Sequence, residues 1–273
     1  MSSFATSDRT YQHGHHASVV ANHAKRTAEV DAAFFLSFLK PGMRLLDVGC
    51  GPGSITVGLA KRVAPGETIG IDPSSSVIRT AASVASGLSD RRLTFEVGDI
   101  YISRFGNETF DAVFAHQVLQ HLPRPIEALR RARMLLRPGG VVGVRDVDWG
   151  STTFYPDNEG MRRFLAIYYD LARRSGAEPN AGRHLRCWFR EAGFGETRVT
   201  TSTVSYTDLI ATAAWGDTYA ERTLRSNIAD RALELGIATR SELEQIAVAW
   251  RDWGRDPHAF FCFSQTEVVA WKS

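Results

Sequence analysis

An acidic residue and three evenly spaced glycines follow a short apolar run near residue 48. Asp47 precedes Gly49, Gly51 and Gly53, so glycine occupies every second position. Glycine adopts turns that other residues avoid, and it lets a ligand approach the backbone closely. A helix that begins after such a turn offers unpaired N–H groups and a positive dipole end. We therefore expect a platform for an anionic group, with Asp47 placed to hold an ammonium group of the same ligand.

The spacing of these glycines separates two classes of nucleotide-binding protein. The dinucleotide fingerprint is G-x-G-x-x-G, and here Ser54 stands where its third glycine should be, one residue after Gly53. A pyrophosphate also has no ammonium group for Asp47 to hold. The pattern therefore disfavours a nicotinamide-dependent oxidoreductase. That class remains an alternative, as does a non-catalytic binding module that keeps the fold.

The elements that must position these residues follow from the hydrophobic pattern of residues 44–147. Short apolar runs alternate with amphipathic stretches, and this alternation predicts βαβ units with right-handed crossovers and helices on both faces of a parallel sheet. The carboxyl ends of such strands are where open α/β sheets bind ligands. The expected strands are 44–48, 67–71, 92–97, 110–115 and 139–147, and the expected helices are 53–64, 74–86, 117–122 and 125–136.

The flanking regions have a different pattern. A helix is expected over 19–39, ended by Pro41 and Gly42. Beyond residue 150 we expect helices over 158–176, 182–194 and 207–256, and strands over 196–205 and 260–272. If those strands complete the same sheet, the fold class is α/β, a doubly wound, mostly parallel seven-stranded sheet. The helical insertions at 155–176 and 207–256 would form a lid.

Residues 1–273 then form a single domain with three parts. These are an N-terminal arm and helix (1–40), a ligand-binding core (41–150), and a segment that completes the sheet and carries the insertions (151–273).

Five motifs in the core occur in the order found in a known family. They are LLDVGCGPGS (45–54), IGIDPS (69–74), VGDI (97–100), FDAVFAHQVLQHL (110–122) and MLLRPGGVV (134–142). Together they resemble class I S-adenosylmethionine-dependent methyltransferases, in particular the ubiquinone/menaquinone-biosynthesis type. The resemblance implies a Rossmann-like methyltransferase fold, S-adenosyl-L-methionine as the cofactor of the 41–150 core, and methyl transfer as the activity.

The resemblance also implies roles for individual residues. The Asp72 carboxylate would accept hydrogen bonds from the ribose hydroxyls. Asp99 would take the adenine amino group, with the Ile100 N–H against the ring. Similar enzymes often fold an N-terminal segment over the cofactor, which favours a contact from Tyr11, or from His15 or His16. The full expected cofactor-binding set is Tyr11, Asp47, Gly49, Cys50, Gly51, Gly53, Asp72, Pro73, Asp99, Ile100, His116 and Gln117.

No catalytic residue is assigned by the sequence, because a sulfonium methyl is already activated and its transfer is an in-line displacement. The protein must chiefly hold the acceptor atom close to the methyl and opposite the sulfur. The candidates for a general base or an orienting residue are His15, His121, Asp146 and Asp148. For His121 a structural role is at least as well supported, and Arg26 is expected on a solvated helix face.

Composition limits the partners. Lys and Arg number 32 against 30 Asp and Glu, a net charge of +2, which gives no reason to expect nucleic acid or a membrane. The expected partner is a small, largely apolar methyl acceptor, such as a secondary metabolite or a quinone-like molecule. The three widely spaced cysteines and the polar N-terminus predict a cytoplasmic protein without a disulfide framework. No metal is expected, because the histidines near residue 15 have no partner at ligand spacing.

Overall fold

The sheet has seven strands in the order β3-β2-β1-β4-β5-β7-β6. The structure is a computed structural model that describes residues 26–86 and 92–273. Strands β1 to β5 pair in parallel, and β7 runs antiparallel to both β5 and β6. The strands are β1 (Leu45–Val48), β2 (Thr68–Asp72), β3 (Leu93–Val97), β4 (Phe110–His116), β5 (Leu136–Tyr155), β6 (Thr197–Tyr206) and β7 (Phe260–Trp271).

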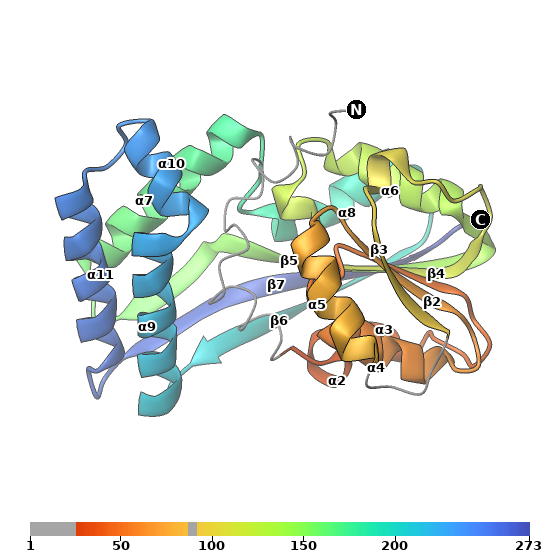
Figure 1. The fold of residues 1–273 in the computed structure, drawn as a ribbon, viewed down its shortest axis with the longest axis horizontal. Coiled ribbons are helices and arrows are strands. Elements are labelled where there is room, and N and C mark those ends of the chain that lie inside the picture. Colours follow the sequence, from red (N-terminus) through yellow and green to blue (C-terminus); the bar gives the residue numbers. More distant parts are fainter. Residues whose placement is uncertain (1–25, 87–91) are drawn as a thin grey trace.

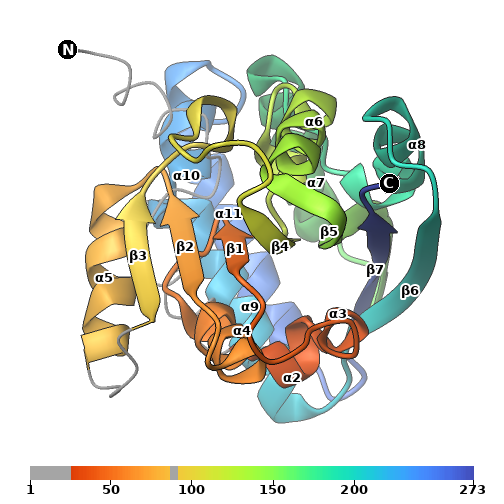
Figure 2. The same ribbon diagram turned by 90° about the vertical axis from the view of Figure 1, so that its right-hand side faces the viewer.

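Helices cover both faces of this sheet, as Figures 1 and 2 show. The doubly wound α/β class expected from the sequence is therefore confirmed. The helices are α2 (Ala28–Asp31), α3 (Ala33–Leu36), α4 (Ser54–Val63), α5 (Ser75–Ser86), α6 (Pro125–Leu135), α7 (Glu159–Ser175), α8 (Ala181–Glu191), α9 (Leu209–Arg225), α10 (Asn227–Glu234) and α11 (Arg240–Gly254). Two short 3₁₀ turns are η2 (Ile100–Ile102) and η3 (Leu119–His121).

The strand order reverses at β1. This strand lies between β2 and β4, so the chain leaves the carboxyl ends of β1 and β4 in opposite directions. All residues of β1 and β2 are buried, as expected for central parallel strands with helices on both faces. The reversal places the glycine turn after β1 beside the end of β4.

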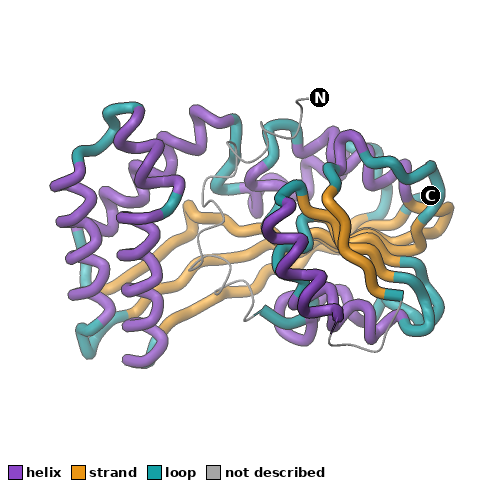
Figure 3. The backbone as a smooth tube through the Cα atoms, viewed as in Figure 1, coloured by secondary structure: helices purple, strands orange, loops and turns teal. Residues whose placement is uncertain are grey.

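Strand β5 is longer than the sequence indicated. A strand was expected over 139–147, but β5 continues to Tyr155 and pairs with β7 beyond a register shift between Asp148 and Thr153. Strands β5, β6 and β7 run past the core, where α7, α9, α10 and α11 lie over their far ends (Figures 1 and 3). The sequence assigned no element to residues 148–154, and pairing with β7 extends the strand through this stretch.

The N-terminal helix expected over 19–39 is the main error in the secondary structure. Residues 26–39 form two one-turn helices, α2 and α3, separated at Ala32, whose ψ is 12°. Residues 19–25 lie outside the described part of the chain. The break lets Phe35 turn onto the sheet, where its ring packs fully buried against Phe114, with ring centroids 5.6 Å apart.

None of the helices in the described ranges is long and apolar enough to cross a membrane.

The contact between Phe35 and Gly143 of β5 gives a test of how the N-terminal helices are held. A Cβ at position 143 would lie 2.4 Å from the Phe35 ring, so the ring would have to move. We expect Gly143→Ala to lower the free energy of unfolding by about 1–3 kcal/mol, measured by urea denaturation. Gly195→Ala is the control, because a Cβ there meets nothing within 4 Å. Equal stability of the two variants would contradict this packing.

Candidate active site

The glycine turn after β1 is tied to β2 and leaves one side open. The backbone N–H groups of Gly49 and Cys50 donate to the Ile71 carbonyl at 2.8 and 3.0 Å. A Cβ at Gly53 would lie 2.6 Å from the Phe95 ring, and one at Gly49 would lie 2.5 Å from Val118, so packing requires both glycines. At Gly51 φ is +55°, and a Cβ would meet nothing within 4 Å. Gly51 therefore leaves backbone open to a ligand.

The carboxylate of Asp72 reaches back to this turn from the end of β2. One oxygen accepts from the Gly51 N–H at 3.3 Å, and the other accepts from the Ser74 N–H at 2.9 Å. These bonds fix the carboxylate at the strand ends, directly beside the open face of Gly51. Pro73, the next residue, is exposed.

Asp47 and Cys50 lie beneath the same turn. Asp47 is buried and accepts a hydrogen bond from the Thr56 hydroxyl of α4 at 2.6 Å. Burial raises the pKa of Asp47 to about 7, which the Thr56 bond opposes and the charge of Asp72 reinforces. Burial also raises the pKa of the Cys50 thiol well above its usual value, helped by the charges of Asp47 and Asp72. Cys50 is therefore a protonated, packed thiol rather than a nucleophile.

Asp99 follows β3 at the same edge of the sheet. Its carboxylate accepts from the Tyr101 N–H at 2.9 Å and so caps η2. Asp99 is partly exposed, while Ile100 beside it is buried. Asp99 and Ile100 therefore lie together directly after β3, and their contact with a ligand stays a prediction.

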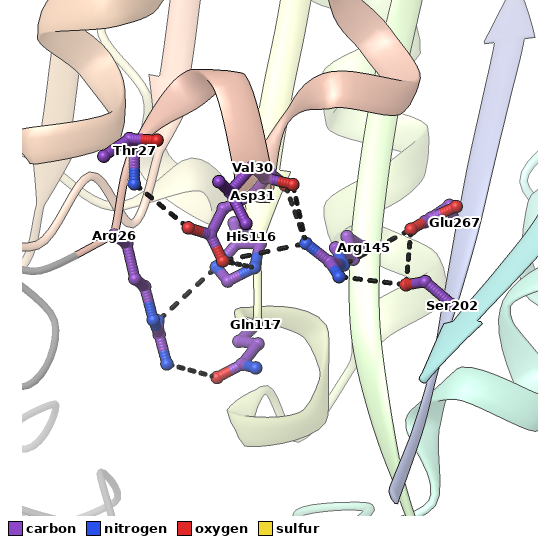
Figure 4. A network of polar contacts seen from close by, with 9 residues as sticks. All are labelled: Arg26, Thr27, Val30, Asp31, His116, Gln117, Arg145, Ser202 and Glu267. Carbon is purple, nitrogen blue, oxygen red and sulfur yellow. Dashed lines mark hydrogen bonds and ion pairs between the residues drawn. The ribbon is translucent and has the colours of Figure 1, made fainter. Parts of the chain in front are cut away.

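His116 and Gln117 end β4, and both contact Arg26. The Arg26 guanidinium donates to the Gln117 side-chain oxygen at 2.7 Å and lies 3.4 Å from His116 Nδ1 (Figure 4). Gln117 has a φ of +54°, which is uncommon for a residue with a side chain and often marks a functional position. Burial lowers the pKa of His116 well below its usual value, as do the charges of Arg26 and Arg145, so His116 is neutral.

Arg145 of β5 links this region to strands β6 and β7 on the same face of the sheet. Its guanidinium donates to the carbonyls of Val30 and Asp31, both at 3.3 Å, and to the Ser202 hydroxyl at 2.9 Å. It also lies 3.6 Å from the Asp31 carboxylate and 3.4 Å from that of Glu267 on β7. Figure 4 shows this chain of contacts from Arg26 to Glu267. The α2 segment that carries Arg26 is therefore anchored to three strands.

The other catalytic candidates have structural contacts. Side chains alternate along a strand, so Asp146 and Asp148 lie on the face opposite Arg145. Asp146 is fully buried and accepts from the Leu119 N–H at 3.0 Å, which holds η3. Asp148 binds Arg183 of α8 through both oxygens, at 2.6 and 2.7 Å.

His121 ends η3 and is held in its neutral form. Burial lowers its pKa to about 3, with a further contribution from the charge of Arg26. A histidine with so low a pKa is a weak base near pH 7. These contacts do not support a base among His121, Asp146 and Asp148. The expected contacts of Tyr11, His15 and His16 lie outside the described residues.

A cluster of aromatic side chains covers the far ends of β5, β6 and β7. Trp149 stacks on Phe263 with ring centroids 5.1 Å apart, and Trp215 of α9 stacks on Tyr206 at 4.1 Å. Tyr219 lies between them, 6.1 Å from Trp149 and 4.6 Å from Trp215. Trp149 lies four residues after Arg145, the last residue of β5 that pairs with β4, so this aromatic cluster adjoins the strand ends described above.

Sequence reasoning missed the anchor formed by Arg145 and Glu267, and it placed Arg26 on a solvated face. The available signal was a charge inside an apolar strand, in VVGVRDV (141–147) and in FFCFSQTEVVAW (260–271). Charged residues are rarely buried unless they are paired. Two such charges therefore indicate a pair, although only the β5–β7 register shows that Arg145 faces Glu267.

Among the described residues, no group of three or more His, Cys, Asp or Glu side chains is arranged to hold a metal ion.

Comparisons with known proteins agree on one family. A family model described as a methyltransferase domain matches residues 39–193. An uncharacterized methyltransferase of Schizosaccharomyces pombe is 32% identical, over 95% of this chain and 95% of its own. A probable methyltransferase of Aspergillus luteorubrus is also 32% identical, over 96% of this chain and 97% of its own.

A solved structure supports the fold. The phosphoethanolamine N-methyltransferase 2 of Haemonchus contortus, in complex with phosphomonomethylethanolamine and S-adenosylhomocysteine, superposes with a TM-score of 0.63 at 18% identity. The match covers 100% of this chain and 60% of that protein.

The burial of Asp146 predicts how stability depends on pH. Burial raises the pKa of Asp146 to about 8, although hydrogen bonds from the backbone of residues 118–120 act to lower it. In the unfolded chain an Asp has a pKa of about 3.9, so between about pH 4 and 8 only the folded state holds this proton. The contribution of Asp146 to stability therefore falls as pH rises, by up to about 1.4 kcal/mol per pH unit.

We expect Asp146→Asn to retain the bond from the Leu119 N–H and to lose this dependence. Unfolding free energies measured in urea at pH 5 to 8 should fall less steeply for Asp146→Asn than for the wild type. Asp157→Asn, at an exposed ion pair with Arg162, is the control and should keep the wild-type slope. Parallel profiles for the wild type and Asp146→Asn would contradict the protonated state of Asp146.

Proposed function

Because the chain belongs to the class I S-adenosylmethionine-dependent methyltransferases, we propose that it transfers a methyl group to a small, largely apolar molecule by in-line displacement. Its cofactor is S-adenosylmethionine. A secondary metabolite or a quinone-like compound fits the proposed acceptor class. The observation that carries the proposal is the open turn at Gly51 with the Asp72 carboxylate fixed beside it, at the reversal of strand order.

The residues at this edge fit the cofactor chemically. The open backbone at Gly51 suits close approach of the ligand, and the Asp72 carboxylate suits the ribose hydroxyls. Asp47 would pair with the ammonium group of the methionine part. Asp99 and Ile100 would hold the adenine, and His116 with Gln117 would border the remaining part of the ligand. When bound, the cofactor supplies a methyl group activated by a positively charged sulfur.

The protein's task is then to bind, orient and exclude water. The Arg145 anchor holds Arg26 on Gln117, so the end of β4 has a fixed shape before any ligand arrives. The neutral His116 and the weakly basic His121 would add no positive charge of their own to the site. Transfer to an acceptor that arrives as an anion, or with an unprotonated lone pair, needs no strong base.

The aromatic cluster at the ends of β5, β6 and β7 supports an apolar acceptor. Buried aromatic rings beside a ligand site provide a large apolar contact area with a few polar atoms. The Haemonchus protein, crystallised with phosphomonomethylethanolamine, is a related fold with a small molecule bound. Balanced charge over the whole chain gives no support to a nucleic acid acceptor. The cytoplasmic location and the division into an arm, a core and an insertion-bearing part remain predictions.

Replacement of Asp72 tests the position of the ribose. Hydrogen bonds to a charged group contribute about 1.5–3 kcal/mol, so Asp72→Ala should weaken S-adenosylhomocysteine binding by about 10- to 100-fold in calorimetry. Asp157→Ala, at a solvent-exposed ion pair, is the control and should bind like the wild type. Unchanged affinity of Asp72→Ala would place the cofactor elsewhere.

The raised pKa of Asp47 predicts a pH dependence of cofactor binding. The ligand's ammonium group stays protonated between pH 5 and 7, whereas Asp47 with a pKa of about 7 becomes protonated and neutral as pH falls. The dissociation constant of S-adenosylhomocysteine should therefore rise by up to about tenfold per pH unit below pH 7.

Asp47→Asn should bind more weakly at pH 8, with a dissociation constant that changes little between pH 5 and 8. The same slope in the wild type and in Asp47→Asn would show that Asp47 does not hold the ammonium group.

A further inference from the structure

Arg222 of α9 is a buried cation that forms no ion pair with any described residue. Arg222 is only 5% exposed, and its Nε has no hydrogen-bond partner. The guanidinium lies 5.0 Å from the centroid of the Tyr219 ring. A guanidinium does not lose its proton in a protein, so Arg222 is buried as a charge. Contact with one ring compensates only part of the cost of that burial.

The polar atoms of the aromatic rings in the cluster can donate hydrogen bonds. Within the aromatic cluster, Trp149 Nε1 and Trp215 Nε1 are buried without a hydrogen-bond partner. The Tyr219 hydroxyl has the Arg222 side chain as its partner and keeps its own proton to donate. An indole N–H and a guanidinium can only donate, and a phenol can donate as well. Trp215, Tyr219 and Arg222 are spaced i, i+4 and i+7, so they share one face of α9. A ligand that satisfies this face must supply acceptor atoms or negative charge.

A second cation approaches the same cluster from the cofactor side. Arg26 donates to Gln117 at the end of β4. Its charge lowers the pKa values of Tyr219 and Tyr206, although burial has the larger effect and raises them. The charge of Arg222 acts on both tyrosines in the same direction. The acid that acts on Tyr206 is Asp31, and its carboxylate already lies beside Arg145 and His116. The cluster between α9 and the end of β4 is therefore electropositive.

We propose that the methyl acceptor is a planar, apolar molecule with an anionic oxygen, such as a carboxylate or an acidic phenolate, and that Arg222 is the counter-ion of that oxygen. This proposal rests on the proposed methyl transfer and adds the charge of the acceptor. Trp149, Trp215 and Tyr219 supply the apolar surface and donate to the remaining oxygen atoms. Arg222 binds the acceptor and takes no part in the displacement itself.

Binding of matched probes tests the charge preference. The protein is first saturated with S-adenosylhomocysteine, and the affinities of 2-naphthoate and of neutral 2-naphthalenemethanol are then measured by calorimetry. A charge-assisted hydrogen bond predicts that the wild type binds 2-naphthoate about 10- to 100-fold more tightly. Arg222→Met should abolish this preference, and Arg222→Lys should retain part of it. The control is Arg225→Met, which removes an exposed arginine of the same helix that pairs with Glu221.

Thermal stability distinguishes a ligand-binding Arg222 from a structural one. An unpaired buried charge destabilises the free protein, so Arg222→Met should raise the melting temperature in the absence of ligand. It should also remove the increase in melting temperature that 2-naphthoate gives the wild type. An arginine that serves the fold would give the opposite sign, because its replacement would lower the melting temperature.

Several outcomes would overturn the proposal. They are equal affinity of the wild type for the two probes, no binding of either probe, a preference that survives in Arg222→Met, and a lower melting temperature or loss of folding in Arg222→Met. The probe measurements are repeated on the protein without S-adenosylhomocysteine. Failure of S-adenosylhomocysteine to bind would contradict the proposed function, whereas loss of the acid preference alone would contradict only the role of Arg222.

Discussion

The reversal of strand order at β1 is the constraint on which the site depends. Crossovers leave β1 and β4 toward opposite faces of the sheet, so the crossover helices α4 and α6 leave the space beyond the carboxyl ends of these strands uncovered. The glycine turn, Asp72 and Gln117 converge there although 68 positions separate Gly49 from Gln117 in the sequence. The turn is held by the Ile71 carbonyl. A Cβ at Gly51 would meet nothing within 4 Å, whereas one at Gly49 or Gly53 would meet Val118 or Phe95.

Some buried charged side chains have partners within the protein, and others do not. Arg145, Glu267 and Ser202 form a closed set in which each charged group has oxygen or nitrogen partners, so the cost of burial is largely compensated. On the opposite face, the partly exposed Arg183 pairs with the buried Asp148. Arg222 lacks such a set among the described residues. Of two buried arginines, one serves to position the chain, and the other is available to a ligand.

Much of the core followed from the sequence because its signals are local. The strand ends at Asp47, Asp72 and Asp99 and the helices between them are set by periodicity over ten or so residues. The length of β5 and the break at Ala32 were not predicted, because each depends on tertiary partners, β7 in one case and the Phe35–Phe114 packing in the other. Arg26 was misplaced for the same reason, since its partners lie about 90 positions away.

Strands β5, β6 and β7 belong both to the core and to the region under α9 and α11. The β6–β7 ladder is continuous from Thr197 to Tyr206, so a hinge between these two halves would have to break its hydrogen bonds. Access to the aromatic cluster then depends on the helices that lie above these strands. Substitutions on those helices can change which molecules enter while the geometry of the nucleoside end stays the same.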